Sequence, residues 1–146
     1  MKNKTTKEAI LNVAQKAFIE KDEKVLVVWN KHGIDFPGGR INEDEVKNGE
    51  PKNLAESLRR EVSEETGLEI KILNPFATWF GLRGRSKTFV VGYICKWVAG
   101  EVKLSDEHHK YEWVSGSDFM KFSEDGEYFE ALNKYFKINE PKGNNQ

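Results

Sequence analysis

The stretch LAESLRREVSEETGL, from Leu54 to Leu68, is the feature that most constrains the fold of this chain. Its aliphatic residues recur every three or four positions, a spacing that is typical of an amphipathic helix. Asn53 is a suitable N-cap, and Gly67 supplies the left-handed residue that ends many helices. We therefore predict a helix that begins after Asn53 and packs one face on a core.

Two carboxylates of this helix are expected to point toward the core. On a wheel of about 100° per residue, Glu61 and Glu65 fall within the aliphatic stripe, and Glu64 flanks it. Inward carboxylates among like charges are strongly disfavoured unless they are paired, protonated or bound to a cation. Hard cations such as Mg²⁺ take carboxylate oxygens, so the pattern favours a metal site, with a structural ion-pair network as the alternative. The aliphatic stripe consists of Leu54, Leu58, Val62 and Leu68.

Length and charge exclude several classes of protein. The chain has 146 residues, with 23 lysines and arginines against 24 acidic residues, so no broad positive field attracts a nucleic-acid polymer or an anionic membrane. No apolar run of about 18 residues is present. We expect a soluble, cytoplasmic protein with a single domain over residues 1–138 and a flexible tail over 139–146. Cys95 lies in the apolar run FVVGYIC and is expected to be a buried thiol.

The remaining pattern indicates strands around the helix. Residues 9–19 are read as a strand, with a helix as the alternative, and a hairpin turn at 21–24 leads into the β-branched strand KVLVVWN. DFPGGR is a tight turn, and residues 41–53 are expected to be a surface loop. The order of elements suggests an α+β or α/β sandwich with a mixed β-sheet between helices. Further strands are expected at EIKILN, FATWF, KTFVVGYICKWV and KYEWVS, a hairpin turn at RGRSK, and a short and a longer helix between residues 118 and 138.

PGGR followed by RREVSEETGL resembles the Nudix box, the MutT-like signature G-x5-E-x7-R-E-U-x-E-E-x-G-U, in which U is a bulky aliphatic residue. The first half departs from the signature, because seven extra residues separate Gly39 from Arg60 and fall in the loop 41–53. Glu50 is the best candidate there for the first glutamate. The second half matches at Arg60, Glu61, Val62, Glu64, Glu65, Gly67 and Leu68.

The resemblance implies a Nudix-like α/β/α sandwich and hydrolysis of a nucleoside diphosphate linked to another group, by attack of water on phosphorus. It implies Mg²⁺ or Mn²⁺ as cofactor, and Arg60 as the residue that orients the glutamates. The general base would be Glu61, Glu64 or Glu107, which precedes the tryptophan strand in SDEHHKYEWVS. The implied metal ligands are the carbonyl of Gly38 and the carboxylates of Glu61, Glu64, Glu65 and Glu107.

Substrate contacts are less constrained by the pattern. Phe36 is expected to stack on a base, and Arg83 and Arg85 to bind phosphate. The alternatives are that aromatic residues are core residues and that the arginines keep a turn soluble. His108 and His109 lack the cysteine partners or spacing of a zinc site. Residues 43–45 lack the ligand pattern of an EF-hand. Trp29, Trp79 and Phe80 are further aromatic candidates.

Because DFPGGR is similar to the corresponding segment of MutT-like pyrophosphatases, (d)NTPs are the first expected substrates, with nucleotide sugars and dinucleoside polyphosphates as alternatives. Pro75 comes too early after the box for the pattern of ADP-ribose hydrolases. A non-catalytic nucleotide-binding protein is another alternative, because the first half of the box is altered. A prenyl-diphosphate isomerase would need further cysteine and glutamate residues. Exposed strand edges allow a homodimer.

Overall fold

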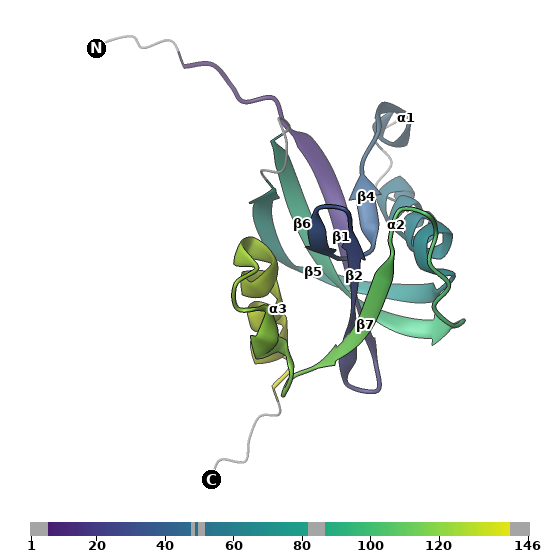
Figure 1. Cartoon of the computed structure of the whole chain (residues 1–146). Helices are drawn as coiled ribbons and strands as arrows, with labels where there is room; N and C mark the ends of the chain where they lie inside the picture. Colours follow the sequence, from purple (N-terminus) through teal and green to yellow (C-terminus); the bar gives the residue numbers. More distant parts are fainter. Residues whose placement is uncertain (1–5, 48, 50–51, 82–86, 141–146) are drawn as a thin grey trace.

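The computed structural model describes residues 6–47, 49, 52–81 and 87–140, and it consists of a mixed β-sheet between helices. Figure 1 shows α2 and α3 on opposite sides of the sheet. The elements are β1 (Asn12–Lys21), β2 (Lys24–Asn30), β3 (Gly33–Asp35), β4 (Gly38–Arg40), α1 (Glu43–Val46), α2 (Lys52–Thr66), β5 (Glu69–Gly81), β6 (Thr88–Ala99), β7 (Lys110–Ser115), the 3-10 helix η1 (Phe119–Phe122) and α3 (Gly126–Ile138).

The sheet has the strand order β3-β2-β1-β6-β5, with β4 also pairing with β1 and β7 with β2. β1 and β6 are parallel, from Asn12 opposite Thr88 to Glu20 opposite Lys96. The other pairings are antiparallel. The predicted sandwich with a mixed sheet is therefore confirmed.

The strand predicted at residues 9–19 forms as β1, which begins three residues later and ends two residues later, and its side chains alternate between the two faces of the sheet. Ala17 and Ile19 belong to one hydrophobic cluster and Phe18 to the other, and all three are fully buried. This alternation has the period of a β-strand. Cys95 is also fully buried, and burial raises the pKa of its thiol to about 12.

Each face of the sheet carries its own core. One core joins the sheet to α2 through Leu58 and Val62, and the other joins it to α3 through Leu132 and Tyr135. Of the aliphatic stripe, Leu58 and Val62 of α2 and Leu68 just after it are buried, as the helical period predicts, whereas Leu54 is partly exposed. The helix is thereby held with one face against the sheet, which decides where its carboxylates lie.

Three local expectations were wrong. Residues 41–53 are not all loop, because Asn42 forms a capping box with Glu45 and starts α1. α2 begins at Lys52, so Asn53 is a helical residue and not the N-cap. EIKILN and FATWF form one strand, β5, which passes Pro75 with irregular pairing to β6. Edge strands tolerate proline and bulges, which explains why one strand continues through Pro75 where two strands were expected.

The other elements match the sequence pattern. The hairpin between β1 and β2 turns at Asp22 and Glu23, both of which have positive φ, and Gly67 ends α2 with φ 75°. Most of RGRSK lies outside the described residues, as does most of the C-terminal tail. In the described part of the chain, every helix is too short or too polar to cross a membrane.

Candidate active site

The two glycines of β4 lie against the inward carboxylates of α2. The amide of Gly38 donates a hydrogen bond to Oε1 of Glu65 at 3.1 Å. A Cβ on Gly39 would collide with Oε2 of Glu61, so this position has no room for a side chain while Glu61 keeps its place. Glu61 and Glu65 are one helical turn apart, and β4 passes both of them. The glycines therefore allow the backbone to approach the carboxylates closely.

The protonation of these two glutamates is perturbed by burial. Only 4% of Glu65 is exposed, and desolvation raises its pKa to about 8, although the Gly38 amide and Lys16 act in the opposite direction. Desolvation also raises the pKa of the half-buried Glu61. Glu107 and the two glutamates repel one another and contribute to both shifts. The site thus concentrates negative charge that nearby basic groups do not balance.

The loop between β6 and β7 brings Glu107 to α2. At the end of α2, the carbonyls of Thr66 and Glu65 accept hydrogen bonds from the amides of Lys103 and Ser105, at 2.8 and 3.0 Å. These carbonyls have no partner within the helix, so the loop satisfies them. The amide of Glu107 then donates to Oγ of Ser105 at 3.3 Å. The loop is therefore attached to the helix that carries the other carboxylates.

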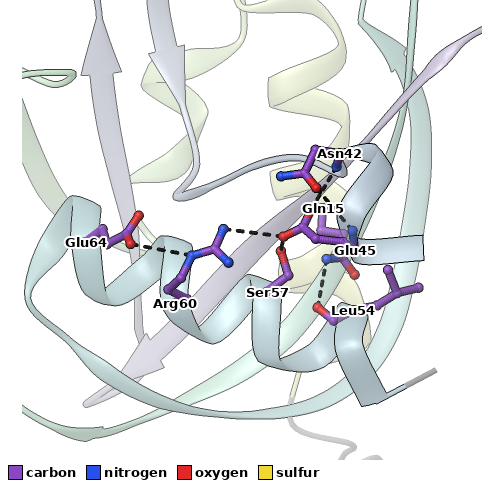
Figure 2. Close-up of polar contacts among 7 residues, drawn as sticks. All are labelled: Gln15, Asn42, Glu45, Leu54, Ser57, Arg60 and Glu64. Atoms are coloured by element: carbon purple, nitrogen blue, oxygen red, sulfur yellow. Dashed lines mark hydrogen bonds and ion pairs between the residues drawn. The ribbon is translucent and has the colours of Figure 1, made fainter. Parts of the chain in front are cut away.

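Arg60 lies between two glutamates on the outer side of α2 (Figure 2). Its Nε is 3.4 Å from Oε2 of Glu64, and its Nη2 is 3.3 Å from Oε2 of Glu45. The same oxygen of Glu45 accepts a hydrogen bond from Ser57. Burial alone would raise the pKa of Glu45, but Ser57, Asn42 and Arg60 together lower it. Arg60 therefore pairs with two glutamates, of which Glu45, with 10% of its side chain exposed, is the less exposed.

The sequence analysis did not identify Glu45 as the partner of Arg60, because Glu50 was preferred as the first glutamate of the box. Glu50 lies outside the described residues, whereas Glu45 makes the contact. Glu45 is the sixth residue after Gly39, which is the spacing of the first glutamate in the signature. The seven extra residues therefore fall between Glu45 and Arg60. Counting forward from Gly39, instead of backward from Arg60, would have identified it.

The predicted metal ligands lie in the same region, but their oxygens do not surround a common position for a metal ion. Glu64 has 62% of its side chain exposed, and Glu107 is exposed as well. Among the described residues, no three His, Cys, Asp or Glu side chains converge closely enough to hold a metal ion as they stand. The charges of Glu61, Glu65 and Glu107 are therefore close enough to interact. Their oxygens do not form a complete set of metal ligands.

The substrate-binding predictions have different outcomes. Phe36 is fully buried and stacks on Phe18 with ring centroids 4.0 Å apart, so it is a core residue in this structure and not a surface for stacking a base. Arg83 and Arg85 lie outside the described residues. Trp79 is partly buried against Phe18, and its indole nitrogen has no hydrogen-bond partner among the described residues.

The other two aromatic candidates lie on opposite parts of the sheet. Phe80 is 55% exposed near the end of β5 and packs its ring beside that of Phe89. Trp29 packs against the core on the α3 side and carries the ammonium of Lys110 over its ring. Neither is among the residues that line the pocket beside the carboxylates, so the sequence expectation for these rings stays a prediction.

A pocket of about 490 Å³ opens beside the carboxylates. Gly38, Glu65 and Glu107 contribute to one part of its lining. The rest is formed by the turn between β2 and β3, the residues just before β7, Lys16 and Asp35. His108 lies in this wall with 8% exposure, and desolvation lowers its pKa. The lining of the pocket thus combines carboxylates with groups that carry nitrogen donors.

A mixed sheet between helices, with a Gly-Gly strand against buried glutamates of one helix, defines a class of small α/β/α proteins with a carboxylate-lined site. Comparison with known proteins identifies the family. The NUDIX domain model matches residues 11–135. The chain therefore belongs to the Nudix family, and it is an enzyme of the hydrolase type, a pyrophosphohydrolase.

Relatives of the chain agree with this assignment. An 8-oxo-dGTP diphosphatase of Buchnera aphidicola is 32% identical over 111 residues, which cover 74% of this chain and 74% of the relative. A MutT protein from Methanosarcina mazei has a similar structure, with a TM-score of 0.68, 26% identity, and coverage of 88% of this chain and 99% of the other. A C. elegans Ap4A hydrolase shares the fold, with a TM-score of 0.70, 20% identity, and coverage of 88% and 97%.

Proposed function

We propose that this chain is a Mg²⁺- or Mn²⁺-dependent pyrophosphohydrolase of the MutT type, which cleaves a diphosphate bond in a (d)NTP. The observation that carries the proposal is the pair of inward carboxylates, Glu61 and Glu65, held against the Gly38–Gly39 backbone. The similarity to an 8-oxo-dGTP diphosphatase supports the choice of a (d)NTP among the substrates of the family.

The donor set fits a hard divalent cation. Carboxylate oxygens and a peptide carbonyl are the ligands that such cations prefer. The raised pKa of Glu65, about 8, shows that its charge is costly in the absence of a cation, and a bound cation would reverse this cost. We propose Glu61, Glu64, Glu65, Glu107 and the carbonyl of Gly38 as the residues that hold it. When bound, the cation would offset the charge of the phosphates and lower the pKa of a water molecule.

The protein groups have separable tasks in this proposal. Glu61 and Glu64 are the proposed catalytic carboxylates, one of which accepts the proton of the attacking water. Arg60 holds Glu64 through its Nε, while Glu45, whose carboxylate accepts a hydrogen bond from the Ser57 hydroxyl, contacts the guanidinium from the other side. The guanidinium is therefore constrained at two of its nitrogens, which restricts where the Glu64 carboxylate lies.

The contact between Arg60 and Glu45 also bears on the non-catalytic alternative. That alternative depended on a disrupted first half of the box. Glu45 occurs at the signature spacing from Gly39 and pairs with Arg60 at 3.3 Å, so the inserted residues leave this pair intact. This supports turnover over simple nucleotide binding.

The test is a product assay with Mg²⁺ or Mn²⁺ on canonical and oxidised (d)NTPs, nucleotide sugars, ADP-ribose and dinucleoside polyphosphates. We expect (d)NTPs to give a nucleoside monophosphate and pyrophosphate. Glu64→Gln should reduce kcat by at least about 100-fold, a loss that corresponds to about 2.7 kcal/mol of transition-state stabilisation. Its circular dichroism spectrum and melting temperature should stay close to those of the wild type, because the side chain is 62% exposed.

Glu56→Gln is the matched control, because Glu56 is an exposed glutamate of the same helix on the side away from the sheet. It should keep the activity of the wild type. Preferred turnover of another substrate class would refute the MutT-type assignment. Equal activity of Glu64→Gln and the wild type would refute the catalytic role of Glu64.

A further inference from the structure

We propose that another pocket, at the C-terminal end of α3, binds an organic cation in which an ammonium group is carried on an apolar body of about the size of one ring. This α3 pocket has a volume of about 650 Å³, and none of the described residues lines both it and the pocket beside the carboxylates. Its walls come from the hairpin between β1 and β2, from β6, from the segment after β7 and from α3. The end of α3 and the hairpin both lie at the lower end of the view in Figure 1.

A buried hydroxyl without a partner lies in the α3 pocket. Tyr135 lines the pocket and is only 2% exposed, and its hydroxyl forms no hydrogen bond with any described residue. In the described part of the chain, the unpaired side-chain atoms that are sealed from solvent belong to Trp79 and His108, so the Tyr135 oxygen is open to the pocket. Burial and the charge of Glu20 raise the pKa of Tyr135, so this hydroxyl lies near a second lining residue. A ligand atom is the partner that the hydroxyl lacks.

The charged groups of the α3 pocket favour a cation. Lys96 lines the pocket, but its ammonium is 2.7 Å from Oε1 of Glu20, so these two charges offset each other. Glu23 and Glu140 also line it, and neither carboxylate forms an ion pair or hydrogen bond with a described residue. The other lysine of the lining is Lys137, in the last turn of α3. Two unpaired carboxylates therefore outweigh one unpaired ammonium.

The end of α3 adds to this negative potential. The last carbonyls of a helix have no partner within it, so its C-terminus carries a partial negative charge that favours cations. Asn139 and Glu140, which follow α3, both line the pocket. The Asn139 side chain donates a hydrogen bond to the Tyr135 carbonyl at 2.8 Å, which holds this end of the helix in place. The pocket is therefore built at the negative end of the helix dipole.

The remaining wall is aromatic. Phe119 and Phe136 line the pocket and stack with ring centroids 4.9 Å apart. The ring of Phe136 also meets that of Tyr135 edge-on, with centroids 5.2 Å apart. Aromatic rings bury an apolar body and attract a cation to their faces. An ammonium on an apolar body therefore matches the carboxylates, the hydroxyl and the rings together, whereas an anion of the same shape is repelled.

The first experiment titrates phenethylamine, which is a cation at pH 7, into the full chain by calorimetry with Mg²⁺ present. Two molecules of similar shape serve as comparisons, the neutral 2-phenylethanol and the anionic 3-phenylpropionate. We expect the amine to bind at least about fivefold more tightly than the alcohol, and the acid most weakly, because only the cation gains the charge contacts. Equal affinities for the amine and the alcohol, or no binding of the amine, would overturn the proposal.

Tyr135→Phe locates the binding in the α3 pocket. The change removes the hydroxyl and keeps the ring, so the melting temperature should stay close to that of the wild type. We expect phenethylamine to bind at least about threefold more weakly, because the hydroxyl is lost as a partner of the ligand. Unchanged binding of the amine to this variant would overturn the assignment of the site.

The double variant Glu23→Gln/Glu140→Gln tests the charges. Both residues are exposed, and we expect the Kd of phenethylamine to rise by about fivefold while that of 2-phenylethanol stays the same. Glu124→Gln/Glu130→Gln is the matched control, because it removes two charges from exposed residues outside this lining. Equal weakening in the two double variants would show an effect of net charge alone and would overturn the proposal.

Activity measurements separate the α3 pocket from the proposed function. Without the amine, Tyr135→Phe and both double variants should hydrolyse (d)NTPs like the wild type, because none of the changed residues belongs to the proposed catalytic site. Turnover of (d)NTPs without selective binding of the amine would overturn the α3 pocket and leave the function standing. Selective binding by a protein that hydrolyses none of the tested compounds would support the pocket and refute the function.

Discussion

Glu65 couples the protonation of the site to the stability of the fold. Its pKa is about 8 in the folded protein against the ordinary glutamate value of 4.5, chiefly because of burial. Between these two values the folded state holds a proton that the unfolded state releases. The free energy of unfolding should therefore fall as pH rises from about 4.5 to about 8, by at most about 1.4 kcal/mol per pH unit, and level off above that.

We predict that Glu65→Gln removes this dependence in metal-free protein, because the amide oxygen can still accept the bond from Gly38 without a charge. At pH 8 with EDTA, urea unfolding should show the variant to be more stable than the wild type by about 2 kcal/mol or more. At pH 4.5 the two should be similar. Mg²⁺ should stabilise the wild type and not the variant. Equal pH profiles for the two proteins would contradict the prediction.

Gly39 is predicted to act through the space that it leaves for Glu61. Gly39→Ala introduces a Cβ that collides with Oε2 of this carboxylate, which must then rotate away. We expect the affinity for Mn²⁺, measured by electron paramagnetic resonance, to fall by about tenfold, with a small change in stability. In Gly81→Ala, the nearest atom to the new Cβ would be 3.7 Å away, an ordinary contact. This control should bind Mn²⁺ like the wild type; equal losses would contradict the prediction.

At the scale of the element, α1 is a helix of four residues that owes its position to its cap. Asn42 accepts a bond from the Glu45 amide, and the Glu45 carboxylate accepts one from the Asn42 amide at 2.7 Å. That carboxylate also contacts Ser57 and Arg60 (Figure 2). The cap of α1 therefore helps to position the arginine that holds Glu64.

We predict that Asn42→Ala destabilises the protein by about 1 kcal/mol, the usual cost of a lost N-cap. Because Glu45 is then less ordered, kcat should fall severalfold with little change in KM. Lys47→Ala, at the other end of α1, should change neither quantity. Denaturant unfolding and steady-state kinetics on the same samples provide the measurement. Unchanged stability and kinetics in Asn42→Ala would show that α1 does not support Arg60.

At the scale of the molecule, the two cores should contribute differently to the site. Leu58 joins α2 to one face of the sheet, and Leu132 joins α3 to the other (Figure 1). Leu58→Ala and Leu132→Ala should each cost about 2 to 5 kcal/mol, because both residues are fully or almost fully buried.

Metal affinity should distinguish the two variants. Leu58→Ala loosens the helix that carries the glutamates, so its Kd for Mn²⁺ should rise, whereas that of Leu132→Ala should stay within about twofold of the wild type. Calorimetry at a temperature where both variants are folded provides the comparison. An equal rise in both would indicate that the site depends on global stability and not on the packing of α2.

The periodic parts of the chain were the most predictable. The helical wheel identified Leu58, Val62 and Glu65 as inward residues, and all three are buried. Repeated local spacing carries this information, because one face of a helix or strand must meet the core. The short helix α1 and the continuity of β5 were not recovered. Four residues give too little periodicity, and tertiary pairing overrides the local signal of Pro75.

Taken by itself, the sequence determined that α2 turns glutamates toward the core and that these glutamates belong to a Nudix box. Both follow from residue types at short, regular spacings. The tertiary structure alone decided that the Ser57 hydroxyl joins the contact between Glu45 and Arg60, that the segment before β7 joins the end of α2, and that Lys31 and His109 line one pocket. Those contacts join distant parts of the chain, so they depend on strand register and helix packing, which local patterns do not encode.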